Sequence, residues 1–268
     1  MRLDRASWSQ LSTHADCEMA WWLEKVVRAP GRTAAWFHHG TAVHSAIEEW
    51  ERAGRISDDG AVEIFVNEYD QLISQHKQSH PDLSLWLRGR GSTEKDIETR
   101  RTKGVDQVEW YTQFAKESEF EVWKLPDGSP AIEVPFEIQL GGVTVVGYID
   151  VVWQWPDGSI EPVDYKTGTS DQDPYQLALY RVALEELYGV SITHGRYVKL
   201  AKKTADPIDL THPAYSRVWL DNLFADFKYK VEMSDSRPTI TPKLGKTGID
   251  CFTCTQKDNC LPYQAATT

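Results

Sequence analysis

Cysteine is scarce in this sequence, and long apolar runs are missing from it. Only 4 of the 268 residues are cysteine. No apolar run approaches the roughly 18 residues that a membrane-spanning helix needs, so we expect a soluble protein without a membrane partner. The first residues also lack the apolar segment of a signal peptide, which makes the cytoplasm the expected location.

Positively charged residues are also few relative to negatively charged ones. The chain has 29 lysine and arginine residues against 40 aspartate and glutamate residues, and its net charge is −11 at pH 7. This balance excludes a protein that coats nucleic acid through a general positive field, but it leaves room for a local basic groove. The candidates for such a groove, with solvated surface charge as the alternative, are Arg88, Arg90, Arg100, Arg101, Lys199, Lys202 and Lys203.

The apolar pattern changes from helical to extended spacing near residue 119. Helices are predicted over 5–28, 40–54, 61–77 and 105–118, and the polar segment 78–104 is predicted to be a loop or lid. Strands are predicted over 119–125, 131–139, 143–155 and 159–165, then a helix at 174–189, a strand at 193–200, a helix at 213–233 and an irregular tail. This order predicts one α/β domain over 1–268, with a helical N-terminal part (1–118), a core sheet and its helix (119–200), and a C-terminal helix and tail (201–268).

Two carboxylates and an ammonium group interrupt a pair of otherwise apolar predicted strands. Asp150 and Asp164 fall roughly opposite each other across a hairpin that turns at 156–158, and Lys166 follows on the same face as Asp164. Close carboxylates repel unless a proton or a cation lies between them, and a hard divalent cation such as Mg²⁺ suits oxygen ligands. The alternative is a surface hairpin with solvated charges, but the apolar neighbours favour an inner strand pair. The pattern indicates metal-assisted hydrolysis of a phosphodiester.

The motifs around this hairpin resemble those of a known enzyme family. They are G-Y-I-D ending at Asp150, D-Y-K over 164–166, and Q-x-x-x-Y from Gln176 to Tyr180 on the predicted helix. In this combination the chain resembles the PD-(D/E)XK nucleases, in the branch typified by the RecB nuclease domain. The resemblance implies a restriction-endonuclease-like core, in which a mixed central sheet is flanked by helices.

The resemblance also implies a set of metal ligands. His44, on a helix after Gly40, would hold Mg²⁺ or Mn²⁺ together with Asp150, Asp164 and the Tyr165 carbonyl. A core or capping role is the ordinary alternative for a lone histidine. Imidazole is an unusual Mg²⁺ ligand, so His44 shifts the preference toward Mn²⁺.

Other motif residues would act beside these ligands. Lys166 would position the attacking water. Gln176 and Tyr180 stand four residues apart, hence on one helical face, and by resemblance they line the active site. Glu133, on the preceding predicted strand, is a candidate for supporting the ligands, with a solvent-facing edge-strand glutamate as an equal alternative.

The four cysteines form a fifth element of the resemblance. Cys17 stands near the N-terminus, and C-x2-C-x5-C near the other end comprises Cys251, Cys254 and Cys260. Thiols in a reducing compartment indicate metal ligation more than disulfides. The arrangement resembles the iron–sulfur nucleases of the same branch, which include the AddB nuclease domain and CRISPR-associated RecB-type exonucleases. It implies a [4Fe–4S] cluster that staples the C-terminal tail, with a structural Zn²⁺ as the alternative.

Together these features predict a metal-dependent DNA exonuclease that acts on single strands or DNA ends in recombination, repair or phage DNA processing. It would work in the bacterial cytoplasm, including that of a phage host. The chain could instead trim DNA ends within a CRISPR adaptation complex or beside a single-strand annealing protein. A DNA-end binding module without catalysis is a third possibility, which the retained Asp150, Asp164 and Lys166 disfavour.

Overall fold

The computed structural model describes residues 2–89, 91–169, 173–233, 251–261 and 263–264. Within these ranges the helices are α1 (Trp8–Asp16), α2 (Glu18–Trp22), α3 (Ala35–Arg52), α4 (Asp58–Ser79), α5 (Thr93–Glu117), α6 (Tyr175–Tyr188) and α7 (Arg217–Met233). The strands are β1 (Arg5–Ala6), β2 (Glu121–Val122), β3 (Ile132–Leu140), β4 (Val143–Gln154), β5 (Ile160–Lys166), β6 (His194–Lys199) and β7 (Pro207–Asp209). None of these helices is long and apolar enough to cross a membrane.

The seven strands of the described ranges form one mixed sheet in the order β1-β4-β5-β6-β7, with β2 and β3 also paired to β4. β4 runs antiparallel to β3 and β5, whereas β1 pairs with β4, and β5 with β6, in parallel. The register places Val151 opposite Val163, so Asp150 and Asp164 fall at facing positions. The predicted hairpin and the mixed sheet flanked by helices are therefore confirmed.

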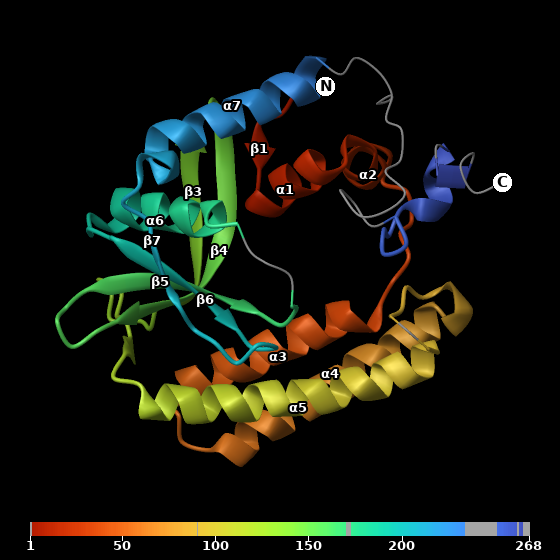
Figure 1. Cartoon of the computed structure of the whole chain (residues 1–268), viewed down its shortest axis with the longest axis horizontal. Helices are drawn as coiled ribbons and strands as arrows, with labels where there is room; N and C mark the ends of the chain where they lie inside the picture. The colour runs from red at the N-terminus through yellow and green to blue at the C-terminus, as the bar shows by residue number, and fades with distance from the viewer. Residues whose placement is uncertain (1, 90, 170–172, 234–250, 262, 265–268) are drawn as a thin grey trace.

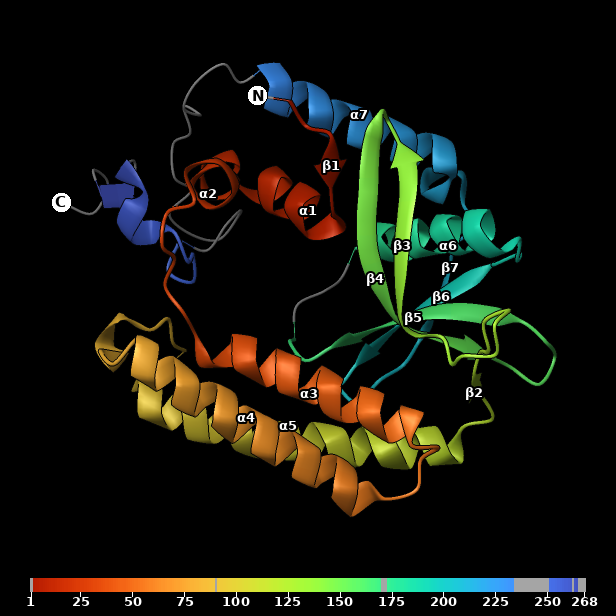
Figure 2. The same ribbon diagram turned by 180° about the vertical axis from the view of Figure 1, so that it is seen from behind.

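Two hydrophobic cores cover the two faces of the sheet. Figures 1 and 2 show α3, α4 and α5 packed together on one side, with α1, α6 and α7 on the other. The α6–α7 core includes Leu179 and Phe224, and the α3–α5 core includes Ile47 and Phe65, all fully buried. Charged side chains that lie between these two cores, such as that of Asp164 at 2% exposure, are therefore in a largely dry environment.

Both long strands change face at one position. Ile149 of β4 packs in the α6–α7 core, but Val151 packs in the α3–α5 core, although residues two apart in a regular strand share a face. β3 switches in the same way on either side of Glu133, whose φ of +50° lies in the left-handed region. Such a conformation costs a non-glycine residue roughly 1–3 kcal/mol. This paired irregularity turns the carboxyl groups of Glu133 and Asp150 toward one face, as a β-bulge does.

Two sequence predictions for the N-terminal part are wrong in detail. Of the helix expected over 5–28, Arg5–Ala6 form β1 instead, and the remainder is divided at Cys17, which ends α1 and caps α2. The loop expected over 78–104 is partly helix, because α5 begins at Thr93 with Ser92 as its N-cap. The other predicted helices and strands lie within a few residues of the observed ones, except that α3 begins five residues earlier than expected and only Glu121–Val122 of the strand predicted over 119–125 forms one.

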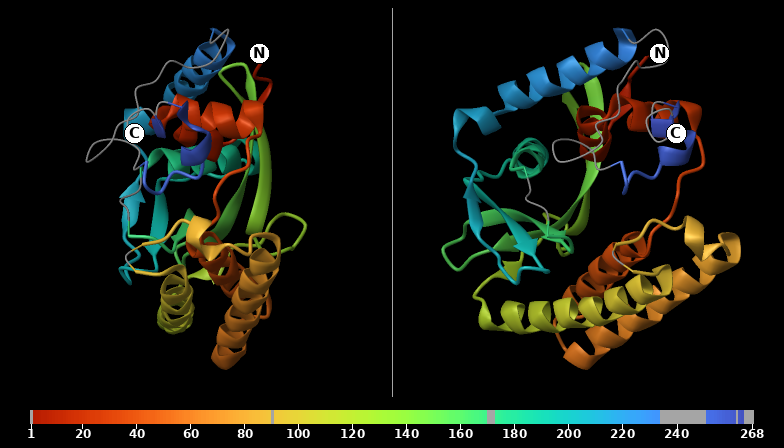
Figure 3. Two further views of the ribbon diagram at one scale, coloured as in Figure 1. Left: turned by 90° about the vertical axis from the view of Figure 1, so that its right-hand side faces the viewer. Right: turned by 45° about the vertical axis from the view of Figure 1, so that its right-hand side comes forward.

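The described part of the C-terminal tail lies against the segment that joins α2 to α3 (Figure 3). The Arg32 guanidinium forms two hydrogen bonds to the Asp258 carboxylate, and the Arg32 amide donates to the Thr255 carbonyl at 2.8 Å. The Asn259 side chain donates to the Pro30 carbonyl at 2.7 Å. These contacts bring the cysteine pattern of the tail next to the helices that flank Cys17. The part of the predicted tail over 234–250 lies outside the described residues.

Gly104 provides a test of how α5 packs on α4. A Cβ at this position would lie 1.9 Å from Cζ of Phe65, which is fully buried and cannot move aside. We expect Gly104→Ala to lower the free energy of unfolding by about 1–2 kcal/mol, since overpacking outweighs the ~1 kcal/mol gain in helix propensity. Chemical denaturation measures the change, with the exposed Lys103→Ala of the same helix as control. A stabilised Gly104→Ala protein would contradict this packing.

Candidate active site

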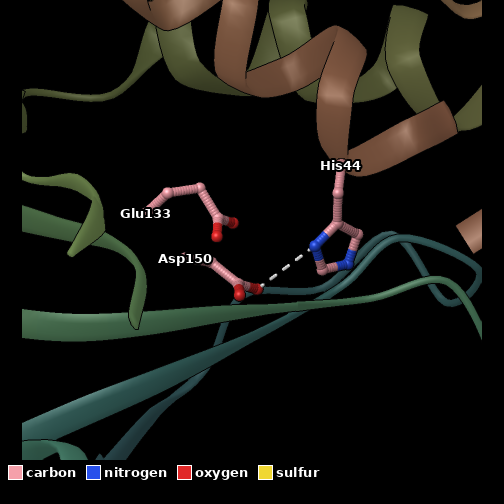
Figure 4. Close-up of side chains that lie close together, drawn as sticks. All are labelled: His44, Glu133 and Asp150. Carbon is pink, nitrogen blue, oxygen red and sulfur yellow. Dashed lines mark ion pairs between the residues drawn. The ribbon is translucent and has the colours of Figure 1, made fainter. Parts of the chain in front are cut away.

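Four elements converge where the sheet changes face. β3 contributes Glu133 at its irregular position, and β4 contributes Asp150. α3 crosses this point with His44, and β5 ends at Lys166. Figure 4 shows the His44 ring and the carboxyl groups of Glu133 and Asp150 pointing toward one another.

His44, Glu133 and Asp150 form the candidate metal centre. Each offers one ligand atom, and these atoms lie within 4.8 Å of one another, the one group of three or more among the described residues that meets this criterion. The His44 Nε2 atom lies 3.0 Å from the Tyr165 carbonyl oxygen, which can only accept, so Nε2 carries the proton. The unprotonated Nδ1 then faces Asp150 Oδ2 at 3.5 Å. Two lone pairs at this distance call for a proton or a cation between them, so the residues fit a divalent metal ion.

Burial and mutual repulsion dominate the electrostatics of this centre. Burial, together with the charge of Asp164, raises the pKa of Asp150 well above its usual range. Burial and the charge of Asp150 raise the pKa of Glu133 to about 7. Burial lowers the pKa of His44. Each shift disfavours the charged form of its group, whereas a divalent cation among these groups would favour the charged carboxylates.

Lys166 lies in a second group of polar side chains beside the candidate metal centre. Its ammonium is 2.6 Å from Asp164 Oδ2 and donates to Gln176 Oε1 at 3.1 Å. The Gln176 amide donates to Asp164 Oδ1 and to the Tyr180 hydroxyl, both at 2.7 Å, and that hydroxyl donates to Asp164 Oδ1 at 3.2 Å. The residues of the D-Y-K and Q-x-x-x-Y motifs therefore form one hydrogen-bonded unit.

The glycine of the G-Y-I-D motif makes room for this unit. A Cβ at Gly147 would lie 2.7 Å from the ring of Phe136, its partner on β3. The Phe136 ring packs edge-on against Tyr180 at 6.0 Å between centroids. A bare backbone at Gly147 thus lets Phe136 hold the Tyr180 ring in place.

A buried network that the sequence analysis missed holds Tyr165. Its hydroxyl lies 2.7 Å from that of Tyr111, which donates to Glu51 at 2.6 Å. Glu51 in turn pairs with Arg55 at 2.8 Å. Glu51 follows His44 by two helical turns and so shares its face of α3, which was a signal available in the sequence. The network fixes the strand segment whose carbonyl contacts His44.

The other residues predicted to have a function are the four cysteines and the candidate basic residues. Burial, with smaller contributions from the other three cysteines, raises the pKa of the Cys254 thiol, so each of those three thiols lies within electrostatic range of Cys254. All four are half-buried. Among the candidate basic residues, Arg100, Arg101 and Lys203 are already ion-paired to acidic neighbours, and Arg90 lies outside the described residues.

The chain is similar in sequence to proteins of two mycobacteriophages. Two similar proteins are both named Gene 69 protein. The one from Mycobacterium phage D29 is 36% identical over 222 residues, which cover 79% of this chain and 82% of that protein. The one from Mycobacterium phage L5 is 32% identical over 264 residues, which cover 87% and 90%.

A solved structure and a family were also matched. The structure, of an Eubacterium rectale protein described provisionally as an exonuclease, covers 92% of this chain and 91% of that one, with a TM-score of 0.45 and 12% identity. The family match spans residues 5–261 and includes every element of the candidate site. The chain belongs to the PD-(D/E)XK nuclease superfamily.

Proposed function

We propose that this protein is a divalent-metal-dependent exonuclease that hydrolyses the phosphodiester bonds of DNA, on single strands or at DNA ends. The observation that carries the proposal is the juxtaposition of two units. His44, Glu133 and Asp150 offer a metal-binding set, and Lys166 lies beside them in contact with Asp164. Metal-assisted hydrolysis of a phosphodiester combines a cation that neutralises the phosphate charge with a positioned donor at the reacting atoms.

In this proposal each group of the chain has a definite task. Lys166 donates a hydrogen bond that orients the attacking water or a phosphate oxygen. Gln176 and Tyr180 hold Lys166 and Asp164 in register and act as positioning residues. The carboxylates of Asp150 and Glu133, with Nδ1 of His44, would hold the metal ion, while Asp164 and the Tyr165 carbonyl border it. A divalent cation there would supply Lewis-acid stabilisation of the phosphate charge.

The donor set bears on which metal would bind. Carboxylate oxygens suit Mg²⁺ and Mn²⁺ alike, whereas an imidazole nitrogen favours the softer Mn²⁺. The sequence predicts Glu133 only as a residue that supports the ligands, but its carboxylate lies in the candidate metal centre with His44 and Asp150. The proposed ligands are therefore His44, Glu133 and Asp150, and we expect Mn²⁺ to support turnover at lower concentration than Mg²⁺.

The related phage proteins bear on the biological role. Two mycobacteriophage proteins match most of the chain, although their names state no activity. This similarity favours phage DNA processing over CRISPR adaptation, with a single-strand annealing protein as the proposed partner. A non-catalytic end-binding module is disfavoured because the Lys166–Asp164 pair and the candidate metal centre are both present.

A cluster held by the four cysteines is part of the proposal. Four thiolates suit a [4Fe–4S] cluster and a structural zinc ion alike, and the arrangement of Cys17 with the C-x2-C-x5-C pattern favours the iron–sulfur cluster by family resemblance.

The proposed function is tested with end-labelled single- and double-stranded DNA and protein purified without oxygen. We expect degradation with Mn²⁺ or Mg²⁺, none with EDTA, and none with Asp150→Asn purified in parallel, which controls for contaminating nucleases. Label released first from one end identifies an exonuclease and its polarity. Folded protein that cuts neither substrate with either metal would refute the proposal.

A further inference from the structure

One edge of β4 is left open beside the candidate site. Val145 pairs with both Ala6 of β1 and Ile138 of β3, so β1 lies on the edge away from β3. Val151 pairs with both β3 and β5, which puts β5 on that same edge. Among the described residues, no strand pairs with this edge over 146–150, between β1 and β5.

A groove of about 1070 Å³ lies at this gap. It contains Lys166, Gln176 and Tyr180 of the candidate site and extends from them to α1. The groove is therefore continuous with the place where a scissile phosphate would lie. The nucleotides next to that phosphate would enter the groove.

The lining of the groove beyond the site combines aromatic rings with hydroxyl groups. Tyr148, in the middle of β4, is 62% exposed and is the one exposed large hydrophobic residue of β3 and β4. Trp8 and Tyr188, both half-buried against the α6–α7 core, also line the groove, as do Ser7, Ser9 and Ser12. Open rings offer stacking surfaces to bases that are not already stacked in a duplex, and hydroxyl groups donate to phosphate oxygens.

Tyr148 is suitably placed for the first such base. It precedes Asp150 by two residues on the same face of β4: Ile149 between them packs in the α6–α7 core, whereas Asp150 faces His44 of α3 at 3.5 Å. Two residues of a strand span roughly 7 Å. A nucleotide whose phosphate lies at Asp150 can therefore bring a neighbouring base over the Tyr148 ring.

We propose that this groove binds a single DNA strand next to the scissile phosphate, with Tyr148 stacking on a base. The inference rests on the proposed nuclease function and adds the path of the substrate strand. Tyr148 contributes binding of the nucleotide chain, and the chemistry stays with the residues around Lys166 and Asp150.

Steady-state kinetics on an oligothymidylate test this role. We expect Tyr148→Ala to raise KM about tenfold with little change in kcat, since one base–aromatic stack contributes a factor of that order. Tyr148→Phe should restore KM, and hydrolysis of bis(p-nitrophenyl) phosphate, which has no base, should be unchanged. Tyr229→Ala, equally exposed at 63% but on α7, is the matched control. Equal loss of activity on both substrates would overturn the proposal.

A binding assay separates this inference from the proposed function. In EDTA, a 2-aminopurine base in the oligonucleotide should be quenched by the wild-type protein and by Tyr229→Ala. Tyr148→Ala should bind about tenfold more weakly with the quenching lost. That result supports the groove even if the wild-type protein cuts nothing, in which case only the proposed function fails. Unchanged binding by Tyr148→Ala overturns the groove.

Discussion

Replacing Lys166 by alanine is expected to lower kcat for DNA hydrolysis by about a thousandfold, because a preorganised donor at the reacting phosphate contributes two to three orders of magnitude. The Lys166 ammonium is fixed by Asp164 at 2.6 Å and by Gln176 at 3.1 Å. It is therefore held in place before substrate binds. Single-turnover cleavage of labelled DNA measures the loss.

Two further variants make this result specific to the position of the charge. Lys116→Ala removes a lysine that is also ion-paired to an aspartate, at 2.7 Å, but lies outside the site, and it should leave kcat unchanged. Lys166→Arg keeps the charge but replaces a compact ammonium by a planar guanidinium, so we expect it to stay nearly inactive. Thermal melts check the fold, since Asp164 is buried and loses its cation. A Lys166→Ala protein with more than about a tenth of wild-type kcat would contradict the assignment.

The core of the site was predictable because short-range rules control it. A Pro-Asp-Gly turn fixes hairpin register, so Asp150 and Asp164 had to face each other, as the pairing of Val151 with Val163 shows. Helical spacing likewise puts Gln176 and Tyr180 on one face, and they share a hydrogen bond. Both relationships depend on residues close in sequence.

The parts that were missed depend on contacts between distant segments. The change of face at Glu133 requires a left-handed backbone in a residue type that rarely adopts it, and no local pattern predicts that. The first half of α5 is largely charged, and its few buried positions, among them Ile97 and Gly104, are too sparse for a clear helical period. The hydrogen bond between Tyr111 and Tyr165 joins α5 to β5 and was hidden for the same reason.

Replacing Cys17 by serine is expected to remove the proposed cluster and lower Tm by about 10 °C. Cys17 and the other three cysteines stand near opposite ends of the chain, and closing a loop of a hundred residues or more contributes about 4–5 kcal/mol. In a protein of this size each kcal/mol changes Tm by about 2–4 °C. Serine is the informative substitution because Cys17 Sγ caps α2 by accepting from the Ala20 amide, and serine also caps helices well. The loss therefore reports on metal ligation and leaves the cap intact.

Three measurements on protein purified without oxygen decide the point. Iron and zinc content distinguish the two candidate metals, calorimetry gives Tm, and hydrogen exchange at the Arg32 amide, which donates to Thr255, reports whether the tail stays docked. Arg32→Ala serves as the control for Tm and metal content, because it removes the ion pair to Asp258 but keeps all four thiols. This surface pair contributes at most about 1 kcal/mol, so the control should retain its metal and melt only slightly earlier. Cys17→Ser with full metal content and wild-type Tm would mean that the thiols are not ligands. Zinc in place of iron would mean that the four thiols still tie the C-terminal tail to the N-terminal helices, but through a zinc ion.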